Sequence, residues 1–265
     1  YTPFIFIDQE GGVVTRLKED ASITPSAMAV SSTGDPQNAY TAGLICAREL
    51  NAIGVNFNLA PVFDINSNED NPVIGVRSYG DTPEIVSKYA CNMAKGLIDG
   101  GVYACAKHFP GHGDTNVDSH LGLPRIDKTM EELMAFELVP FINASKNGIS
   151  GIMSSHILFP KIEEDNIPAT LSYRIMTELL RNVIGFKGLT LSDCMQMAAI
   201  AKFYGTVQGM LMALKAGVDI IFASHDTGLC VKASELMLES LKTGDIDRKQ
   251  FDTSTNRILE YKKAM

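Results

Sequence analysis

The sequence predicts an α/β fold in which parallel strands alternate with helices, as in a (β/α)8 TIM barrel. Short apolar runs alternate with longer amphipathic segments along all 265 residues, and polar residues repeatedly follow the apolar runs. With 45% hydrophobic residues, a chain of this length can bury the core of one large domain. Because the composition does not shift along the chain, we expect residues 1–265 to form a single domain.

Six short runs have the character of strands. They are apolar on both faces, as strands of a buried parallel sheet are. The expected strands are 4–7, 55–59, 102–106, 149–154, 189–191 and 218–223.

Capping residues mark the helices between these runs. Asp35 and Thr82 each precede a first-turn proline, and Thr129 with Glu132 forms a capping box. A last helix is expected over residues 248–262. Glycines that can end the helices stand shortly before the next strand, at Gly54, Gly100, Gly148, Gly185 and Gly217.

Six strands fall short of the eight that a closed barrel needs. We therefore expect the first one or two βα units of the barrel to be missing upstream of Tyr1. A six-stranded doubly wound sheet is the alternative. The barrel is favoured because polar residues follow nearly every strand, whereas a doubly wound sheet gathers them at one switch point.

The charge and cysteine content limit the partners. A net charge of -8 without any block of Lys or Arg argues against nucleic acid and anionic membranes. No apolar run is long enough to span a bilayer. The five cysteines show no CxxC pairing, which favours a reducing compartment. We expect a cytoplasmic protein, with a secreted or wall-associated one as the alternative.

Polar residues follow the expected strands at the end where barrel enzymes build their sites. Because the carboxyl ends of parallel strands share one edge, we expect these side chains to gather there. They are Asp8, Asp64, Lys107, His108, His156, Asp193 and His225.

The loop 107–120 has the densest concentration of polar groups. Asp118 and His120 are two positions apart, so the carboxylate can fix the imidazole tautomer and raise its pKa. Such a histidine can both give and take a proton. Two alternatives are a simple loop hydrogen bond and a metal site built from His108, His112, Asp114 and His120.

Several motifs together resemble glycoside hydrolase family 3, in its NagZ-type β-N-acetylglucosaminidase (β-hexosaminidase) branch. The loop 107–120 is the most specific of them, and family 3 β-glucosidases lack its Asp-x-His pair. The motifs are residues 7–12 with Arg16, residues 58–64, residues 72–79, the loop 107–120, and Ser192-Asp193 with Met195.

The resemblance implies a role for each matching position. Asp193 corresponds to the nucleophile, His120 to the general acid/base and Asp118 to the partner that orients His120. An imidazole, with an ordinary pKa of roughly 6.5, can serve both half-reactions near neutral pH. No metal and no cofactor is expected. The residues that match sugar-binding positions are Asp8, Arg16, Arg77, Lys107 and His108.

The expected domain is thus the N-terminally incomplete catalytic barrel of family 3, acting on a carbohydrate. The resemblance implies a retaining exo-β-N-acetylglucosaminidase that acts on bacterial peptidoglycan fragments. Alternatives are a β-N-acetylglucosaminide phosphorylase, a family 3 β-glucosidase, or a non-catalytic sugar-binding protein if the barrel is truly incomplete. Individual residues also have structural alternatives: Asp193 could cap a helix beginning near Met195, and Lys107 and Arg77 could be ion-pair partners of nearby carboxylates.

Overall fold

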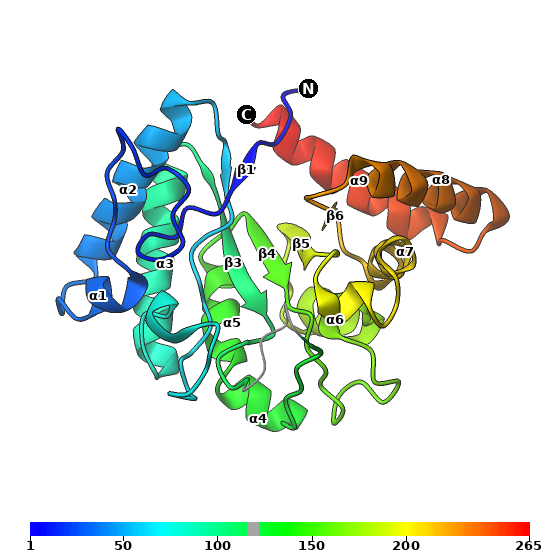
Figure 1. Cartoon of the computed structure of the whole chain (residues 1–265), viewed down its shortest axis with the longest axis horizontal. Helices are drawn as coiled ribbons and strands as arrows, with labels where there is room; N and C mark the ends of the chain where they lie inside the picture. Colours follow the sequence, from blue (N-terminus) through cyan, green and yellow to red (C-terminus); the bar gives the residue numbers. More distant parts are fainter. Residues whose placement is uncertain (116–121) are drawn as a thin grey trace. The chain divides into compact units, whose positions relative to one another are not determined.

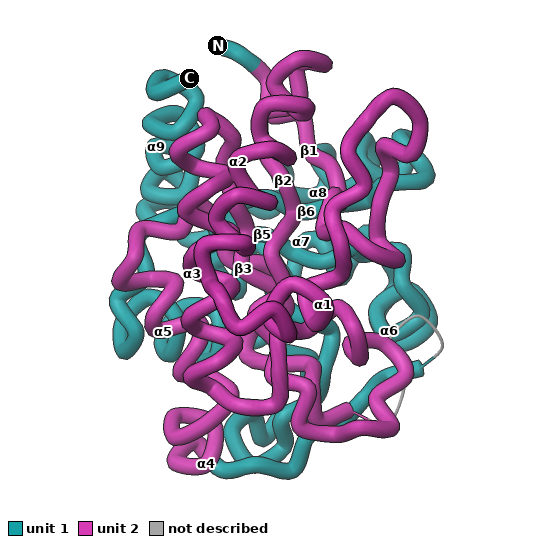
Figure 2. Tube along the Cα trace, turned by 90° about the vertical axis from the view of Figure 1, so that its left-hand side faces the viewer, with its two compact units in different colours: residues 1–2, 117–129, 154–265 teal, residues 3–116, 130–153 magenta. Residues whose placement is uncertain are grey.

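The computed structural model describes residues 1–115 and 122–265. They form two compact units (Figure 2). Unit 2 holds residues 3–116 and 130–153, and unit 1 holds residues 1–2, 117–129 and 154–265. The prediction that residues 1–265 form one N-terminally incomplete catalytic domain stays a prediction.

The six expected strands are all present, with different lengths. The strands are β1 (Phe6–Ile7), β2 (Phe57–Asn58), β3 (Tyr103–Phe109), β4 (Gly151–Ser154), β5 (Leu189–Cys194) and β6 (Ile220–Phe222). They follow one another in chain order, β1-β2-β3-β4 and then β5-β6 in unit 1. β1 pairs parallel to β2, β2 to β3, and β5 to β6. The α/β class with parallel strands is confirmed, while the closed eight-stranded barrel stays a prediction.

Helices connect and cover the strands (Figure 1). In unit 2, α3 and α5 pack against β3. None of the described helices is long and apolar enough to cross a membrane. The helices are α1 (Ala27–Ser31), α2 (Gln37–Ala52), η1 (Gly75–Arg77), α3 (Pro83–Asp99), α4 (Met130–Ala135), α5 (Leu138–Lys146), η2 (Ala169–Leu171), the π-helix η3 (Arg174–Val183), α6 (Ala198–Ala201), α7 (Thr206–Ala216), α8 (Thr227–Thr243) and α9 (Arg248–Lys263).

Helix boundaries largely follow the capping pattern. Thr82 caps α3 by accepting a hydrogen bond from the Ile85 N–H, as predicted. α2 begins one residue later than expected, at Gln37, whose N–H is bound by the Asp35 side chain. α7 ends at Ala216 and is capped by Gly217, which has a left-handed φ of 100° that favours glycine.

The helices α2 and α3 approach each other closely at two glycines. A Cβ on Gly43 would lie 2.3 Å from the Met93 carbonyl oxygen, and one on Gly96 would lie 2.1 Å from the Tyr40 carbonyl oxygen. Because neither glycine has a side chain, the two backbones can pack directly against each other. This contact holds α2 and α3 together beside the strands of unit 2.

A buried carboxylate ties α9 to the rest of unit 1. Asp219 precedes β6, and its two oxygens accept from Arg257 Nη1 at 2.5 Å, Ser254 Oγ at 2.7 Å and Arg181 Nη2 at 2.7 Å. Arg257 and Ser254 lie on α9, and Arg181 lies on η3. These contacts satisfy a charge that is expensive to bury without partners.

Candidate active site

Lys107 lies between two carboxylates in unit 2. Its Nζ is 2.8 Å from Asp8 Oδ1 and 2.7 Å from Glu10 Oε1. Asp8 and Glu10 follow β1, whereas Lys107 belongs to β3, so the pairing of β1 and β3 with β2 brings these side chains together. The side chains of Lys107 and Glu10 are 3% and 6% exposed, and that of Asp8 is 35% exposed. Asp8 is therefore the solvent-facing carboxylate of this group.

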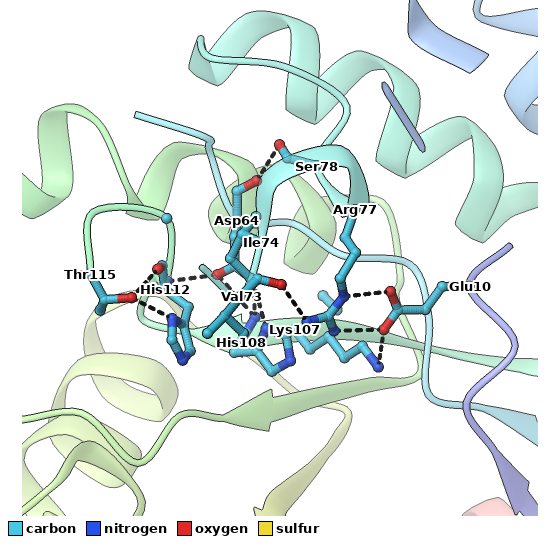
Figure 3. Close-up of polar contacts among 12 residues, drawn as sticks. Glu10, Asp64, Val73, Ile74, Arg77, Ser78, Lys107, His108, His112 and Thr115 are labelled. Atoms are coloured by element: carbon cyan, nitrogen blue, oxygen red, sulfur yellow. Dashed lines mark hydrogen bonds and ion pairs between the residues drawn. The ribbon is translucent and has the colours of Figure 1, made fainter. Parts of the chain in front are cut away.

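Arg77 joins the cluster at the end of η1. Its Nη2 and Nε donate to the two carboxylate oxygens of Glu10, at 2.8 Å and 2.9 Å (Figure 3). Its Nη1 donates to the Val73 carbonyl at 3.0 Å. A two-pronged pair of this kind fixes the guanidinium in orientation as well as in position.

The charges of this cluster support one another. Burial alone would raise the pKa of Glu10, but Lys107 and Arg77 outweigh burial and lower it to about 2. Burial opposes the charge on Lys107 too, but Glu10 and then Asp8 outweigh it and raise the pKa of Lys107. At neutral pH the site therefore holds buried, fully charged groups in fixed positions.

Arg16 approaches the cluster from an exposed loop. Its Nη2 lies 3.8 Å from Asp8 Oδ2, and its side chain is 58% exposed. The buried Gln9 holds this loop, because Gln9 Oε1 accepts from the backbone N–H groups of Arg16 and Leu17. Arg16 is thus held near Asp8 by its backbone, and its side chain stays exposed to solvent.

His108 follows Lys107 but binds a different carboxylate. His108 Nδ1 lies 2.6 Å from Asp64 Oδ2, and the His108 backbone N–H donates to both Asp64 oxygens at 3.1 Å. The His112 N–H adds a bond of 2.7 Å to Asp64 Oδ1. Burial would raise the pKa of Asp64, but the charge of His108 and its hydrogen bond outweigh burial, so the pKa is lowered.

The amide of Asn71 ties the loop after β3 to the segment that leads to Arg77. Its Oδ1 accepts from the N–H groups of Val73 and Ile74, both at 2.8 Å. Its Nδ2 donates to the carbonyl oxygens of His112 and Gly113 at 2.9 Å and 3.0 Å. One buried side chain therefore fixes both segments.

The structure brings together four of the predicted sugar-binding residues, Asp8, Arg16, Arg77 and Lys107, and places His108 next to Lys107 on β3. Lys107 and His108 lie inside β3, which runs to Phe109, and not beyond its end as the sequence predicted. The isolated parallel bridge between Val62 and Lys107 accounts for this extension.

Sequence reasoning missed a role for Glu10 and Asn71 and left Asp64 without one. The available signal for Glu10 was its position two residues after Asp8 at a strand end, where both side chains can face the same way. The ion-pair alternative for Lys107 and Arg77 describes real contacts, since both cations bind Glu10.

Asp193 is the fifth residue of β5, in unit 1. Its Oδ1 accepts from the Cys194 N–H at 2.6 Å, and the residue is half-buried. The helix that follows is α6, which begins at Ala198 with Met197 as its N-cap. The alternative that Asp193 caps a helix beginning near Met195 is therefore wrong.

His156 supports the end of the same strand. Its Nε2 lies 3.1 Å from the Cys194 carbonyl oxygen, and its Nδ1 lies 2.8 Å from Thr170 Oγ1. Ser154 Oγ, 2.8 Å from Thr170 Oγ1, extends the network. Because a carbonyl can only accept, His156 carries its proton on Nε2 and anchors the residue next to Asp193.

Asp118 and His120 lie outside the described residues, so their roles stay predictions. The metal alternative depends partly on His120. Among residues 1–115 and 122–265, no three His, Cys, Asp or Glu side chains gather in an arrangement that could hold a metal ion.

Comparison with known proteins adds three relationships. The chain is 37% identical to "Beta-hexosaminidase A" of Pseudoalteromonas piscicida over 99% of its own length and 47% of that protein. It is 32% identical to a "Beta-hexosaminidase" of Idiomarina loihiensis, over 98% of its length and 77% of that protein. A solved glycoside hydrolase family 3 β-N-acetylglucosaminidase from Paenibacillus sp. str. FPU-7 has a TM-score of 0.96 and 44% identity, over 98% of this chain and 49% of that one.

The chain spans about half the length of two of these proteins. Residues 2–261 match the glycosyl hydrolase family 3 N-terminal domain, which is nearly the whole chain. The resemblance drawn from the sequence motifs is confirmed. This chain belongs to glycosyl hydrolase family 3 and matches the N-terminal domain of that family.

Proposed function

We propose that the protein is a retaining exo-β-N-acetylglucosaminidase that removes terminal β-linked N-acetylglucosamine. The observation that carries the proposal is the charged cluster of Lys107, Glu10, Asp8 and Arg77, which family motifs at β1, η1 and β3 bring together. Rigid charges of both signs can bind the hydroxyl groups of a sugar and fix its orientation. The names of the relatives support the substrate class.

In the proposed reaction, a carboxylate oxygen of Asp193 attacks the anomeric carbon. The bond to the leaving oxygen breaks as His120 delivers a proton to it, and a glycosyl ester forms on Asp193. The neutral imidazole then removes a proton from water, which attacks the anomeric carbon and releases the sugar with the free carboxylate. Asp118 orients His120 throughout.

The sugar-binding part of the proposal rests on exposure and charge. Asp8 is the carboxylate of the cluster that solvent reaches, and it can accept hydrogen bonds from two neighbouring hydroxyls. Lys107 and Arg77 are held by Glu10, so their positions do not depend on substrate. Preorganised groups of this kind lose little freedom when the sugar binds.

The natural substrate class in this proposal is a peptidoglycan fragment that carries N-acetylglucosamine at its non-reducing end. A cytoplasmic location would fit the recycling of such fragments and the five cysteines, which show no CxxC pairing. The hexosamine and the aglycone are separate parts of the proposal, because the cluster around Asp8 can bind the sugar without any contact to the aglycone.

The test is product analysis with an aryl β-N-acetylglucosaminide, with and without inorganic phosphate, beside the matching aryl β-glucoside. We expect release of N-acetylglucosamine as the β-anomer first, faster than release of glucose and independent of phosphate. Asp127→Asn, a change in an exposed ion pair with Arg125, serves as the control variant. N-acetylglucosamine 1-phosphate as the product would identify a phosphorylase, and preferred cleavage of the glucoside would overturn the substrate class.

A further inference from the structure

Asp64 is completely buried, and its carboxylate contacts both backbone N–H groups and the ring of His108. Both oxygens accept the His108 backbone N–H at 3.1 Å, and Oδ1 also accepts the His112 N–H at 2.7 Å. These backbone donors could be satisfied by neutral acceptors. The remaining contact, 2.6 Å from Oδ2 to the ring Nδ1 of His108, joins a buried charge to a titratable side chain.

Hydrogen bonds to the neighbouring backbone hold the Asp64 and His108 pair in place. Ser78 Oγ donates to the Asp64 carbonyl at 2.7 Å, and the Phe63 N–H donates to the Lys107 carbonyl at 2.7 Å. Both contacts fix the backbone on either side of the pair. The ring of His112 lies edge-on to that of His108, with ring centroids 5.6 Å apart, and limits its rotation. Figure 3 shows Asp64, His108 and His112 as one contiguous group.

The direction of the hydrogen bond fixes the tautomer of His108. The hydrogen bonds that the Asp64 carboxylate accepts from the backbone N–H groups of His108 and His112 favour its ionised form. An ionised carboxylate can only accept, so Nδ1 of His108 must carry a proton. In the neutral ring, Nε2 then has a free lone pair.

We propose that Asp64 is a positioning residue for sugar binding: it holds His108 as the Nδ1–H tautomer, so that Nε2 accepts a hydrogen bond from a substrate hydroxyl. The proposal rests on the proposed function and on the sugar-binding role that the family resemblance implies for His108. Without Asp64, the other tautomer would present an N–H at Nε2. A substrate hydroxyl could then bind there only by accepting a hydrogen bond instead of donating one. Asp64 thereby selects a substrate hydroxyl that donates its hydrogen bond to Nε2.

The first test observes the tautomer without using activity. Protein labelled with ¹⁵N in its histidine rings is studied by NMR, and His108→Gln identifies the signals of His108 among the five histidines. We expect a protonated Nδ1 and an unprotonated Nε2 in the unmodified protein, and a shift toward the Nε2–H form in Asp64→Asn. Ser78→Ala, which removes a bond to the Asp64 backbone and leaves the carboxylate intact, should keep the original tautomer.

The second test is a double-mutant cycle on kcat/KM with an aryl β-N-acetylglucosaminide. We expect Asp64→Asn to lower kcat/KM by roughly 10-fold or more, mostly through KM, because the wrong tautomer leaves a sugar hydroxyl poorly paired. In a His108→Gln background the same change should cost less than about 3-fold. Non-additivity of this size is expected only if Asp64 acts through His108.

The outcomes separate this proposal from the proposed function. An Nε2–H tautomer in the unmodified protein, or a tautomer unchanged in Asp64→Asn, overturns the role of Asp64 whatever the activity. Additive losses in the cycle overturn it while the glycosidase function stands. No hydrolysis by the unmodified protein overturns the function, and the NMR result alone then decides whether Asp64 controls the His108 ring.

Discussion

The Lys107 ammonium lies 2.7 Å from Glu10 Oε1, and both side chains are almost completely buried. The same carboxylate binds Arg77, so one acidic residue holds two cations in place. A charge buried without a partner costs several kcal/mol, which makes each member of this cluster dependent on the others. Glu10 is therefore the central residue of the proposed sugar-binding site, although it need not touch the sugar itself.

Replacing Glu10 by Gln should destabilise the fold strongly. Lys107 and Arg77 would lose the negative charge that compensates their burial, and we expect the free energy of unfolding to fall by about 3 kcal/mol or more. Urea unfolding followed by circular dichroism measures the loss. Asp127→Asn, in the exposed pair with Arg125, is the matched control and should change stability little. Equal stabilities of the two variants would contradict the role given to Glu10.

The stability of the protein should fall in acid through Glu10. Its pKa is lowered from an ordinary 4.5 to about 2 by Lys107 and Arg77, against the effect of burial. A carboxyl whose pKa is lower in the folded state stabilises the fold at pH above 4.5, and that contribution is lost as the pH falls toward 2. The loss attributable to Glu10 is about 3 kcal/mol.

Unfolding measured across this pH range in the unmodified protein and in Glu10→Gln isolates the effect. The difference between their stabilities should be largest above pH 4.5 and should shrink as the pH approaches 2. The lowered pKa of Asp64 acts in the same direction in both proteins and cancels in the comparison. A difference that stays constant with pH would show that the pKa of Glu10 is the same in the folded and unfolded states, and would contradict the prediction.

Gly113 should tolerate no side chain. A Cβ there would lie 1.6 Å from the Ile65 carbonyl oxygen, and the Gly113 carbonyl is bound by Asn71. We expect Gly113→Ala to displace this segment and to lower both kcat/KM and stability, the latter by roughly 1–3 kcal/mol. Gly80→Ala is the control, because the three atoms nearest to a Cβ there belong to the Ile85 side chain, the closest at 2.7 Å, and not to backbone. A larger effect at Gly80 would contradict the prediction.

His120→Ala tests the proposed acid/base role. Substrates with poor leaving groups need a proton delivered to the departing oxygen, so they should lose far more rate in the glycosylation step than activated aryl substrates do. Asp118→Asn should give a milder loss. Pre-steady-state rates with a series of aryl leaving groups measure this difference. Equal losses across the series would remove His120 from this role, and loss of activity on adding EDTA would favour the metal alternative.

The sequence predicted all six strands, because buried parallel strands form apolar runs that periodicity detects. Their ends were less accurate. β1 is only Phe6–Ile7, since the Asn56 side chain binds the Ile5 N–H and the Pro3 carbonyl where a longer ladder was expected. β3 extends to Phe109 because Lys107 forms a bridge with Val62, a contact far apart in sequence.

The sequence predicted most residues of the candidate site but only some of the contacts between them. Asp8, Arg77 and Lys107 could be named from family motifs. Glu10, the common partner of Arg77 and Lys107, is identified only by the packing that buries these charges together. The role of His156 was also hidden, because its bond to the Cys194 carbonyl depends on the path of the backbone after β5. Pairings of this kind are set by tertiary packing, which local sequence patterns do not report.

The central claim is that Asp193 forms a covalent glycosyl ester, and trapping that ester tests it most directly. The enzyme is incubated with a fluorinated N-acetylglucosaminyl fluoride, digested and analysed by mass spectrometry. We predict that the label resides on the peptide containing Asp193, that Asp193→Asn abolishes both labelling and hydrolysis, and that thiazoline-type inhibitors bind weakly. Labelling of another residue, or tight thiazoline inhibition without any trapped ester, would contradict the account.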